Sequence, residues 1–432
     1  MDDPRRATPR TDHVLADLRL QEATARLGPT LVKQVVVDVL ARCRAGDVAP
    51  EAVADVAVAS LPVSASTLQP VVNATGGVGH TNLGRAPLSP AAVEAMVTAA
   101  GATDVELDLA TGRRGRRGRG TLAQLAAAVP DAGGVHVVNN GAAALALVTC
   151  ALAGSGREVV VARGEMVEIG DGFRIPELVE SVGARLREVG TTNRVHLEDY
   201  AAAINDRTAF VLKVHPSNFK VTGFTSSVPA DALADLPVPL VVDIGSGLLS
   251  PHPRLPDEPD AASVLRAGAD LVTASGDKLL GGPQCGLLLG RAELVERLRR
   301  HPFARALRVD KLTLAALEAT LAGPQAPVPA ALSRRREDLL ARASAIAASL
   351  SEAVPAEAVA CVAAVGGGGA PGVELPSAAV ALPSSLAEPL RLGSHPGVGR
   401  IERGRLLLDL IVVAPAEDAL LTAAVRAVAA EP

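Results

Sequence analysis

The chain has 432 residues, which is too long for one compact core and predicts two or three domains. Its formal net charge of −5 excludes a protein that binds nucleic acid through a general positive field, so any such contact must come from a local patch. Hydrophobic residues make up 48% of the chain but aromatic residues only 1%, which indicates a core of Ala, Val and Leu.

The four cysteines form no CxxC pair, which argues against a disulfide framework and against a zinc site. The first thirty residues carry charges throughout, so we expect no signal peptide. No apolar run reaches the roughly 18 residues that a membrane helix needs. The sequence therefore predicts a soluble cytoplasmic protein without a metal and without a membrane contact.

Residues 1–66 are predicted to form an N-terminal helical domain. Apolar side chains recur there at helical spacing, as at Leu31, Val35 and Val39. A less regular stretch, residues 61–69, follows and ends at Pro70.

Residues 67–322 are predicted to form an α/β core. Short apolar runs alternate there with helical patterns, and the runs are continuous rather than alternating, which is typical of strands buried on both faces of a mostly parallel sheet. The candidate strands are Val135–Val138, Glu158–Val161, Ala209–Val214 and Leu240–Asp243.

Residues 323–432 are predicted to form a small C-terminal α+β domain. Pro324, Pro327 and Pro329 indicate a linker. A long helix is expected over Arg334–Leu350, and a short strand over Arg405–Val413, with a glycine loop between them at residues 366–369.

Lys278 is the first candidate for chemistry. The chain has 42 basic residues and only five are lysines, so a lysine between an apolar run and a glycine turn is unusual here. A lysine in a desolvated turn can lose its proton and bond covalently to an aldehyde cofactor, which arginine cannot do. The alternative interpretation is a lysine that caps a solvated loop.

Three further features fit a site for pyridoxal 5'-phosphate. Asn140, Gly141 and Ala142 follow a strand and open an Ala-rich helix, which is typical of an anion cradle although many such turns look alike. Asp243 ends a strand, where a carboxylate can keep the cofactor's ring nitrogen protonated; a turn or helix-capping Asp is the alternative. His215 ends another strand and either lies against the cofactor ring or is a structural histidine.

Arginine clusters suggest anionic ligands, because the guanidinium group binds phosphate through two parallel hydrogen bonds. Residues 111–120 hold five arginines in a glycine-rich loop, and Arg85 follows another glycine-rich turn. Arg305 and Arg308 would share a helix face if that segment is helical. A solvated surface is the alternative for each cluster.

Several blocks resemble the bacterial L-seryl-tRNA(Sec) selenium transferases, also called selenocysteine synthases. The matching blocks are residues 72–76 (VNATG), 80–88 (HTNLGRAPL), 111–115 (TGRRG), 163–165 (RGE) with 168–170 (EIG) and 173–176 (FRIP), 188–194 (EVGTTNR), 275–284 (SGDKLLGGPQ) and 305–317 (RALRVDKLTLAAL). The N-terminal helical part is similar to that family's tRNA-binding domain. The chain departs from the family pattern at Gly77, Gly79 and Pro216.

The resemblance implies a pyridoxal-phosphate enzyme of fold type I that converts L-seryl-tRNA(Sec) to L-selenocysteyl-tRNA(Sec) with selenophosphate, through an aminoacrylyl-tRNA intermediate. It also implies a homo-oligomer, described for the family as a decameric ring. The implied catalytic residues are Lys278 and Asp277. The implied cofactor-binding residues are Lys278, Asn140, Gly141, Ala142, Asp243, His215 and Ser275. The implied substrate-binding residues are Arg85, Arg305, Arg308, Arg113 and Arg114.

Two alternatives remain at this stage. One is an enzyme of the same superfamily that catalyses β-elimination on a small phosphorylated amino acid or amino sugar. Such relatives tend to lack the N-terminal domain, so residues 1–66 speak against it. The other is a tRNA-binding protein that has lost catalysis, against which the presence of Lys278 and Asp243 speaks.

Overall fold

The computed structural model describes residues 7–430, and the chain separates into two compact units, Met1–Val71 and Val72–Pro432. The described part of the first unit is helical, as the apolar spacing predicts. Its α-helices are α2 (Thr11–Leu15), α3 (Leu18–Leu27), α4 (Pro29–Ala45) and α5 (Val53–Ala59). No regular element lies between α5 and residue 72, where the sequence predicts an irregular stretch.

Local sequence sets the helix ends of this unit. The Asp17 carboxylate accepts a hydrogen bond from the backbone N–H of Arg19 and so caps α3. Gly28, with a φ of 90°, ends α3, and Pro29 then starts α4 at a position where a missing N–H costs nothing. Val32, Val36 and the other buried apolar side chains of the unit form one small core.

The second unit is built on a seven-stranded sheet in the order β4-β12-β11-β10-β9-β5-β8. Its strands are β4 (Gly134–Val138), β5 (Glu158–Ala162), β8 (Arg185–Val189), β9 (Thr208–Val214), β10 (Leu240–Gly245), β11 (Leu271–Ser275) and β12 (Gly286–Gly290). All four strands expected from the sequence are present. The pairs among β8, β5, β9, β10 and β11 are parallel, whereas β12 runs antiparallel to both of its neighbours.

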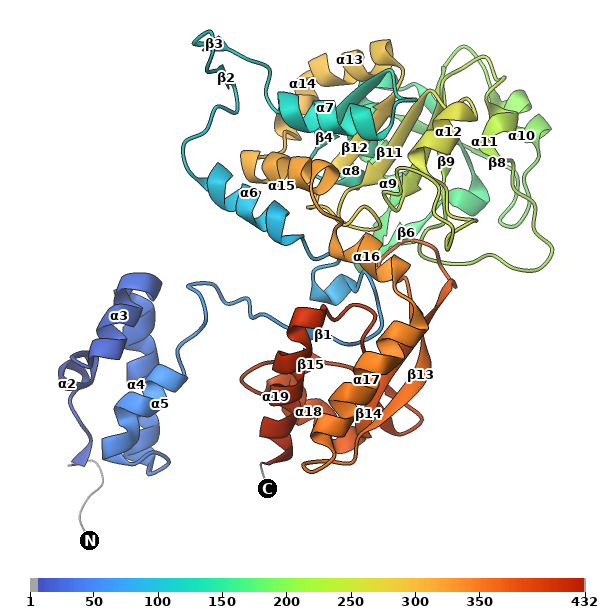
Figure 1. Ribbon diagram of the computed structural model, residues 1–432. Helices are drawn as coiled ribbons and strands as arrows, with labels where there is room; N and C mark the ends of the chain where they lie inside the picture. The colour runs from blue at the N-terminus through green and yellow to red at the C-terminus, as the bar shows by residue number, and fades with distance from the viewer. Residues whose placement is uncertain (1–6, 431–432) are drawn as a thin grey trace. The chain divides into compact units, whose positions relative to one another are not determined.

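Helices cover both faces of this sheet (Figure 1). Successive residues of a strand point to opposite faces, so Val160 packs with one helix layer and Val161 with the other. One layer contains α7 (Arg119–Ala128), α10 (Leu197–Ala203), α11 (Ala230–Leu233), α12 (Ala261–Arg266) and α15 (Lys311–Ala322). The other contains α8 (Gly141–Leu152), α9 (Ile175–Ser181), α13 (Ala292–Arg300) and α14 (Pro302–Ala306). Burial on both faces explains the continuous apolar runs.

The C-terminal part of the chain contains a second, four-stranded antiparallel sheet in the order β13-β14-β17-β16. Its strands are β13 (Glu357–Ala364), β14 (Glu374–Pro383), β16 (Arg400–Glu402) and β17 (Arg405–Asp409). The associated helices are α16 (Pro327–Ser333), α17 (Arg336–Leu350), α18 (Ala387–Leu392) and α19 (Asp418–Ala429). The predicted linker is wrong in part, because α16 begins at Pro327. The expected strand is also shorter, since β17 ends at Asp409.

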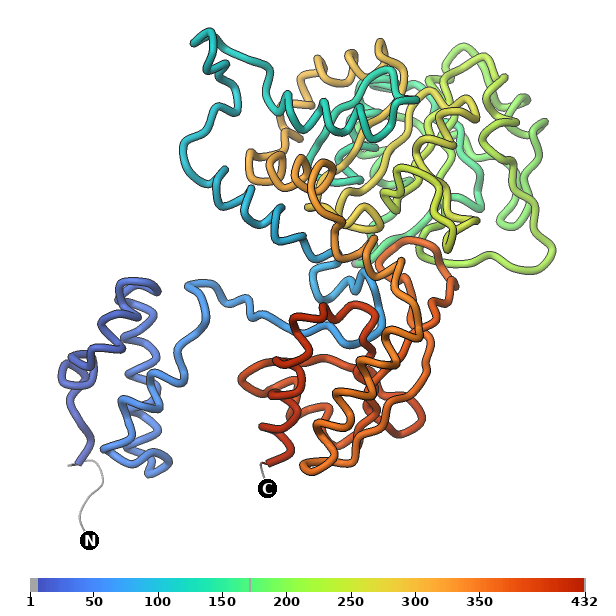
Figure 2. Tube along the Cα trace, in the orientation of Figure 1, coloured from blue at the N-terminus to red at the C-terminus, as the bar shows by residue number. Residues whose placement is uncertain are grey.

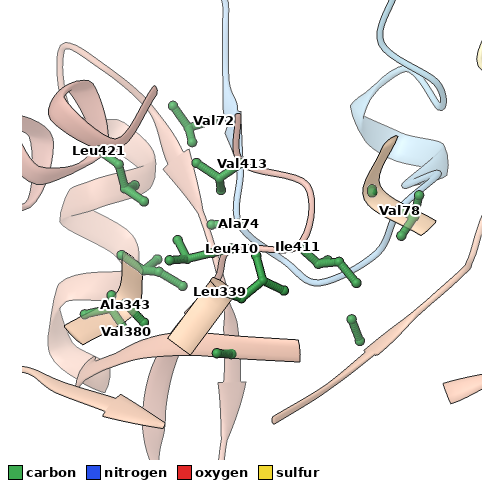
Figure 3. Packing of buried hydrophobic residues seen from close by; sticks show 14 of the residues in the cluster. Val72, Ala74, Val78, Leu339, Ala343, Val380, Leu410, Ile411, Val413 and Leu421 are labelled. Carbon is green, nitrogen blue, oxygen red and sulfur yellow. The ribbon is translucent and has the colours of Figure 1, made fainter. Parts of the chain in front are cut away.

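Residues 72–78 belong by packing to this C-terminal layer. Strand β1 (Val72–Asn73) pairs in parallel with β15 (Gly397–Val398), far away in sequence (Figure 2). Val72, Ala74 and Val78 share one hydrophobic core with residues of α17, β14 and α19 (Figure 3). The predicted domain limits at residues 66 and 322 remain predictions.

The remaining elements are short or lie at the edge of the sheet. They are α6 (Pro90–Ala100), which packs against α15, and the two-stranded pairs β2 (Leu107–Asp108) with β3 (Arg113–Arg114) and β6 (Glu168–Ile169) with β7 (Phe173–Arg174). No helix within residues 7–430 is long and apolar enough to cross a membrane. In this described range, no group of three or more His, Cys, Asp or Glu side chains is placed to hold a metal ion.

A buried ion pair ties residues 72–78 to the C-terminal sheet. The Asp409 side chain is fully buried and binds Arg400 at 2.7 Å, while Arg400 also donates to the backbone oxygen of Thr75 at 2.9 Å. Further donors to the Asp409 carboxylate are the Ser377 hydroxyl and the Ile411 N–H. Its charge is therefore well compensated, and removal would leave Arg400 without a buried partner.

We expect Asp409→Ala to lower the free energy of unfolding by about 3–5 kcal/mol, because it breaks a buried ion pair from one side. Chemical denaturation measures this loss. The control is Glu402→Ala, which removes the other carboxylate of Arg400, 46% exposed and 3.3 Å away. An exposed pair contributes about 0–1 kcal/mol, so equal losses in the two variants would contradict this prediction.

Candidate active site

The candidate site lies where the parallel strands of the large sheet end. Strands β9, β10 and β11 are parallel neighbours, so their carboxyl ends meet at one edge, the usual ligand position in such sheets. The loop from Gly276 to Cys285 joins β11 to β12 and carries Lys278. Backbone hydrogen bonds fix this loop, from Leu279 to Ser246 at 2.8 Å and from Gly281 to Lys278 at 3.0 Å.

Lys278 is half-buried, and its environment disfavours the protonated amine. Burial lowers the pKa of Lys278, the charge of Asp243 opposes that effect, and the positive charge of Arg85 lowers the pKa further. Within residues 7–430 no carboxylate forms an ion pair with Lys278. A Cβ added at Gly368 would lie 3.2 Å from the Lys278 Nζ, so the glycine loop packs directly on this amine.

Asp243 lies near the carboxyl end of β10, two residues before Gly245, and its carboxylate has few hydrogen-bond partners. One of its oxygens accepts a hydrogen bond from the Gly245 N–H at 3.1 Å. Burial raises the pKa of Asp243, and the positive charge of Lys278 opposes this effect. Across the described residues no cation pairs with Asp243 within 4.0 Å, so the site fits a protonated ring nitrogen as a partner.

The turn between β4 and α8 has the form of an anion cradle. Asn140 is the N-cap of α8 and its side chain accepts a hydrogen bond from the Ala143 N–H at 2.8 Å. Gly141 and Ala142 then form the first turn, where free N–H groups and the helix dipole favour an anion. A Cβ at Gly141 would lie 2.6 Å from the Ser275 Oγ, which shows how closely the turn approaches the end of β11.

His215 follows β9 and is held from two sides. Its backbone N–H donates to the backbone carbonyl oxygen of Asp243 at 2.9 Å, and its Nε2 lies 3.1 Å from the Glu258 carboxylate. The sequence did not reveal Glu258, because the segment Pro256–Pro259 carries no pattern that distinguishes it from an ordinary loop.

Asp277 and Arg85 form an ion pair beside Lys278. The Arg85 Nη1 lies 2.7 Å from the Asp277 carboxylate, and the Ala86 N–H donates to the Asp277 backbone oxygen at 3.2 Å. Arg85 adopts a φ of 65°, an unusual value for a residue with a side chain. The sequence alone did not predict this ion pair, because its two residues are 192 positions apart in the chain.

Within the described residues, the remaining candidate arginines make no recorded contact with Lys278. Arg114 and Arg308 both reach the Glu106 carboxylate, at 3.0 and 3.5 Å, and Arg113 is exposed on the β2–β3 hairpin. Arg305 is exposed on α14. Arg305 and Arg308 would share a helix face only if their segment were helical. This condition is not met, because α14 ends at Ala306.

A cavity of about 960 Å³ opens next to this site, and its lining includes His215, Glu258 and Ala370. Lys213 and Glu165 form an ion pair of 2.8 Å on its wall. Lys278 is not among the residues that line this cavity. The sequence singled out neither Glu165 nor this cavity.

Protein-family models match almost the whole chain. A model described as L-seryl-tRNA selenium transferase matches residues 71–414, and one described as selenocysteine synthase N terminal matches residues 5–44. The two matches fall on the second and first structural units, respectively.

Curated relatives show the same likeness over most of their lengths. A protein of Geobacter sulfurreducens named L-seryl-tRNA(Sec) selenium transferase is 42% identical, covering 93% of this chain and 94% of that protein. Proteins of the same name from Moorella thermoacetica and Hyphomonas neptunium are 43% and 45% identical, covering 82% and 78% of this chain and 80% and 78% of those proteins.

A solved structure named D-glucosaminate-6-phosphate ammonia-lyase shares the fold. It is 22% identical, with a TM-score of 0.58, and the match covers 84% of this chain and 96% of that chain. The predicted fold class, a mostly parallel sheet between helix layers with a helical N-terminal part, is confirmed.

Proposed function

The chain belongs to the L-seryl-tRNA selenium transferase family, and from that premise we propose that it converts L-seryl-tRNA(Sec) to L-selenocysteyl-tRNA(Sec) with pyridoxal 5'-phosphate and selenophosphate. The observation that carries the proposal is Lys278, which has a lowered pKa and lies with Asp243 where parallel strands end. The reaction would take place in the cytoplasm, where charged tRNA is used.

The residues at this edge suit the cofactor. The turn at Asn140, Gly141 and Ala142, with Ser275 beside it, would hold the phosphate, and Asp243 would bind the ring nitrogen. His215 would lie against the ring. When bound at Lys278, the cofactor supplies an electron sink that stabilises negative charge at the substrate Cα.

Lys278 would carry the proton transfers. A lysine amine has a reference pKa of about 10.4 and is a poor base at neutral pH while protonated. Burial and the charge of Arg85 lower this pKa, which raises the fraction of free amine. Lys278 can then take the proton from the seryl Cα. The Asp277 carboxylate, paired with Arg85, would orient the loop that carries the amine.

Positive side chains would bind the anionic substrates. We assign Arg85, Arg305 and Arg308 to selenophosphate and include Arg113 and Arg114 among the substrate-binding residues. The exposure of Arg305 and Arg113 supports this assignment, since these groups can meet an anion from solvent or from a second subunit. Arg114 and Arg308 would have to exchange the Glu106 carboxylate for the anion. The chain would act as a homo-oligomer, in the ring described for the family.

The first structural unit would bind the tRNA. The family match to residues 5–44 and the basic residues Lys33, Arg42 and Arg44 on α4 support this role. Binding through phosphate contacts weakens as salt concentration rises. The ammonia-lyase likeness concerns the fold alone, and the family match favours the transferase over the β-elimination alternative.

The test is incubation of the full-length protein with seryl-tRNA(Sec), selenophosphate and pyridoxal 5'-phosphate, followed by identification of the esterified amino acid. We expect selenocysteine. Absence of selenocysteine, together with β-elimination when a small phosphorylated amino acid or amino sugar is supplied, would support the lyase alternative instead. Unchanged serine, with tRNA still bound, would point to a tRNA-binding protein without catalysis.

A further inference from the structure

Glu258 is a buried acid that the mechanism above does not use. Its side chain is 2% exposed, and one oxygen, Oε2, takes two contacts, from the His215 Nε2 at 3.1 Å and from the Ala370 N–H at 2.8 Å. The other oxygen, Oε1, is buried and has no hydrogen-bond partner among the residues that the structure describes.

We propose that Glu258 is a positioning residue that couples the His215 imidazole to the glycine loop covering Lys278. The inference rests on the proposed function, because it assigns the coupled groups to the cofactor site. Glu258 acts through these two partners, and Lys278 remains the reacting group.

The glycine loop needs such an anchor. Gly366, Gly367 and Gly368 have φ values of 65°, 62° and 83°, and Ala370 has a φ of 47° despite its side chain. Glycine adopts such values without strain, but Ala370 is strained there and stays only when its surroundings fix it. The bond from the Ala370 N–H to Glu258 supplies such a constraint. The constrained loop then holds Gly368 against the Lys278 amine.

The second contact sets the imidazole of His215. A carboxylate oxygen accepts hydrogen bonds, so the His215 Nε2 must carry the proton, and in the neutral ring Nδ1 is left as the acceptor. The backbone of His215 is bound to Asp243 at the same time. The Glu258 Oε2 therefore fixes both the His215 imidazole and the glycine loop that packs on Lys278.

A purely structural role fits this arrangement poorly. A buried carboxylate with an unpartnered oxygen carries a desolvation cost that an apolar side chain of similar size would avoid. Two bonds on a single oxygen, to a side chain after β9 and to the backbone of the glycine loop, are better explained by the need to hold both groups in place.

The experiment measures hydrogen exchange of peptides covering residues 366–373 in the full-length protein, with and without added pyridoxal 5'-phosphate, and the rate of cofactor dissociation. In Glu258→Ala and Glu258→Asp the contacts are lost or withdrawn by one methylene, so exchange in these peptides should rise about tenfold to a hundredfold. Cofactor dissociation should also accelerate. Glu258→Gln keeps one oxygen able to accept both bonds and should restore protection. Asp257→Asn, an exposed neighbour, is the control.

Native exchange in the loop of both Glu258→Ala and Glu258→Asp would overturn the proposal. An equal rise in peptides from β5 and β9 would also overturn it, because general destabilisation would then explain the effect. If Glu258→Ala does not fold, Glu258→Asp and Glu258→Gln decide the outcome. Exchange does not depend on turnover, so failure of the aminoacyl-tRNA assay is distinguishable from failure of this coupling.

Discussion

Replacing Lys278 with Ala should abolish both the visible absorbance of lysine-bound pyridoxal 5'-phosphate and the formation of selenocysteyl-tRNA. The variant loses the amine that joins the cofactor and takes the Cα proton. Loss of proton transfer alone lowers the rate about 10²–10⁴-fold, and loss of the covalent attachment adds to this. Absorbance spectra and single-turnover assays with charged tRNA measure the two effects separately.

The matched control for this variant is Lys220→Ala, which removes an exposed lysine. We expect it to keep the absorbance band. The fold of Lys278→Ala should stay intact, since no ion pair within the described range of the chain involves Lys278. A Lys278→Ala protein that keeps the band would show that another amine carries the cofactor.

Replacing Asp243 with Asn should leave the cofactor bound but lower the rate of the chemical step about 10²–10³-fold. Loss of one preorganised electrostatic contact in an active site typically has an effect of this size. Asn has the same shape but no charge, so it cannot keep the ring nitrogen protonated. The charge of Asp243 also raises the pKa of Lys278. In the cofactor-free protein the variant should therefore lower the Lys278 pKa further, and the amine should react with acylating reagents at lower pH.

Asp231→Asn is the control for Asp243→Asn, because Asp231 is an exposed acid on α11. A native rate in Asp243→Asn would remove Asp243 from the site. An unchanged pH profile of Lys278 labelling would show that the charge of Asp243 does not act on the Lys278 amine.

Short-range patterns were sufficient to predict four of the seven strands of the large sheet. Continuous apolar runs predicted β4, β5, β9 and β10, because a strand buried on both faces has no polar side to display. The order of the turn at Gly141, then Asp243, then Lys278 predicted that these residues would meet where parallel strands end. The structure brings them together, and their roles remain proposals.

Features that depend on distant partners were not predictable in the same way. Strand β12 was missed, and its antiparallel direction follows from the tight loop after β11 rather than from its composition. Glu258 gains its significance only from His215 and Ala370, and the glycine loop only from its contact with Lys278. Arg305 and Arg308 would have shared a helix face only if their segment were helical, but Arg308 follows the end of α14 and contacts Glu106.

The most direct measurement is borohydride reduction of the protein loaded with pyridoxal 5'-phosphate, followed by proteolysis and mass spectrometry of the peptides. Reduction makes the bond between a lysine and the cofactor aldehyde permanent, so the added mass marks the lysine that carries it. We predict one modified peptide, the one that contains Lys278. Modification of Lys213 or Lys220 in its place, or of none of the five lysines, would contradict the assignment of this site.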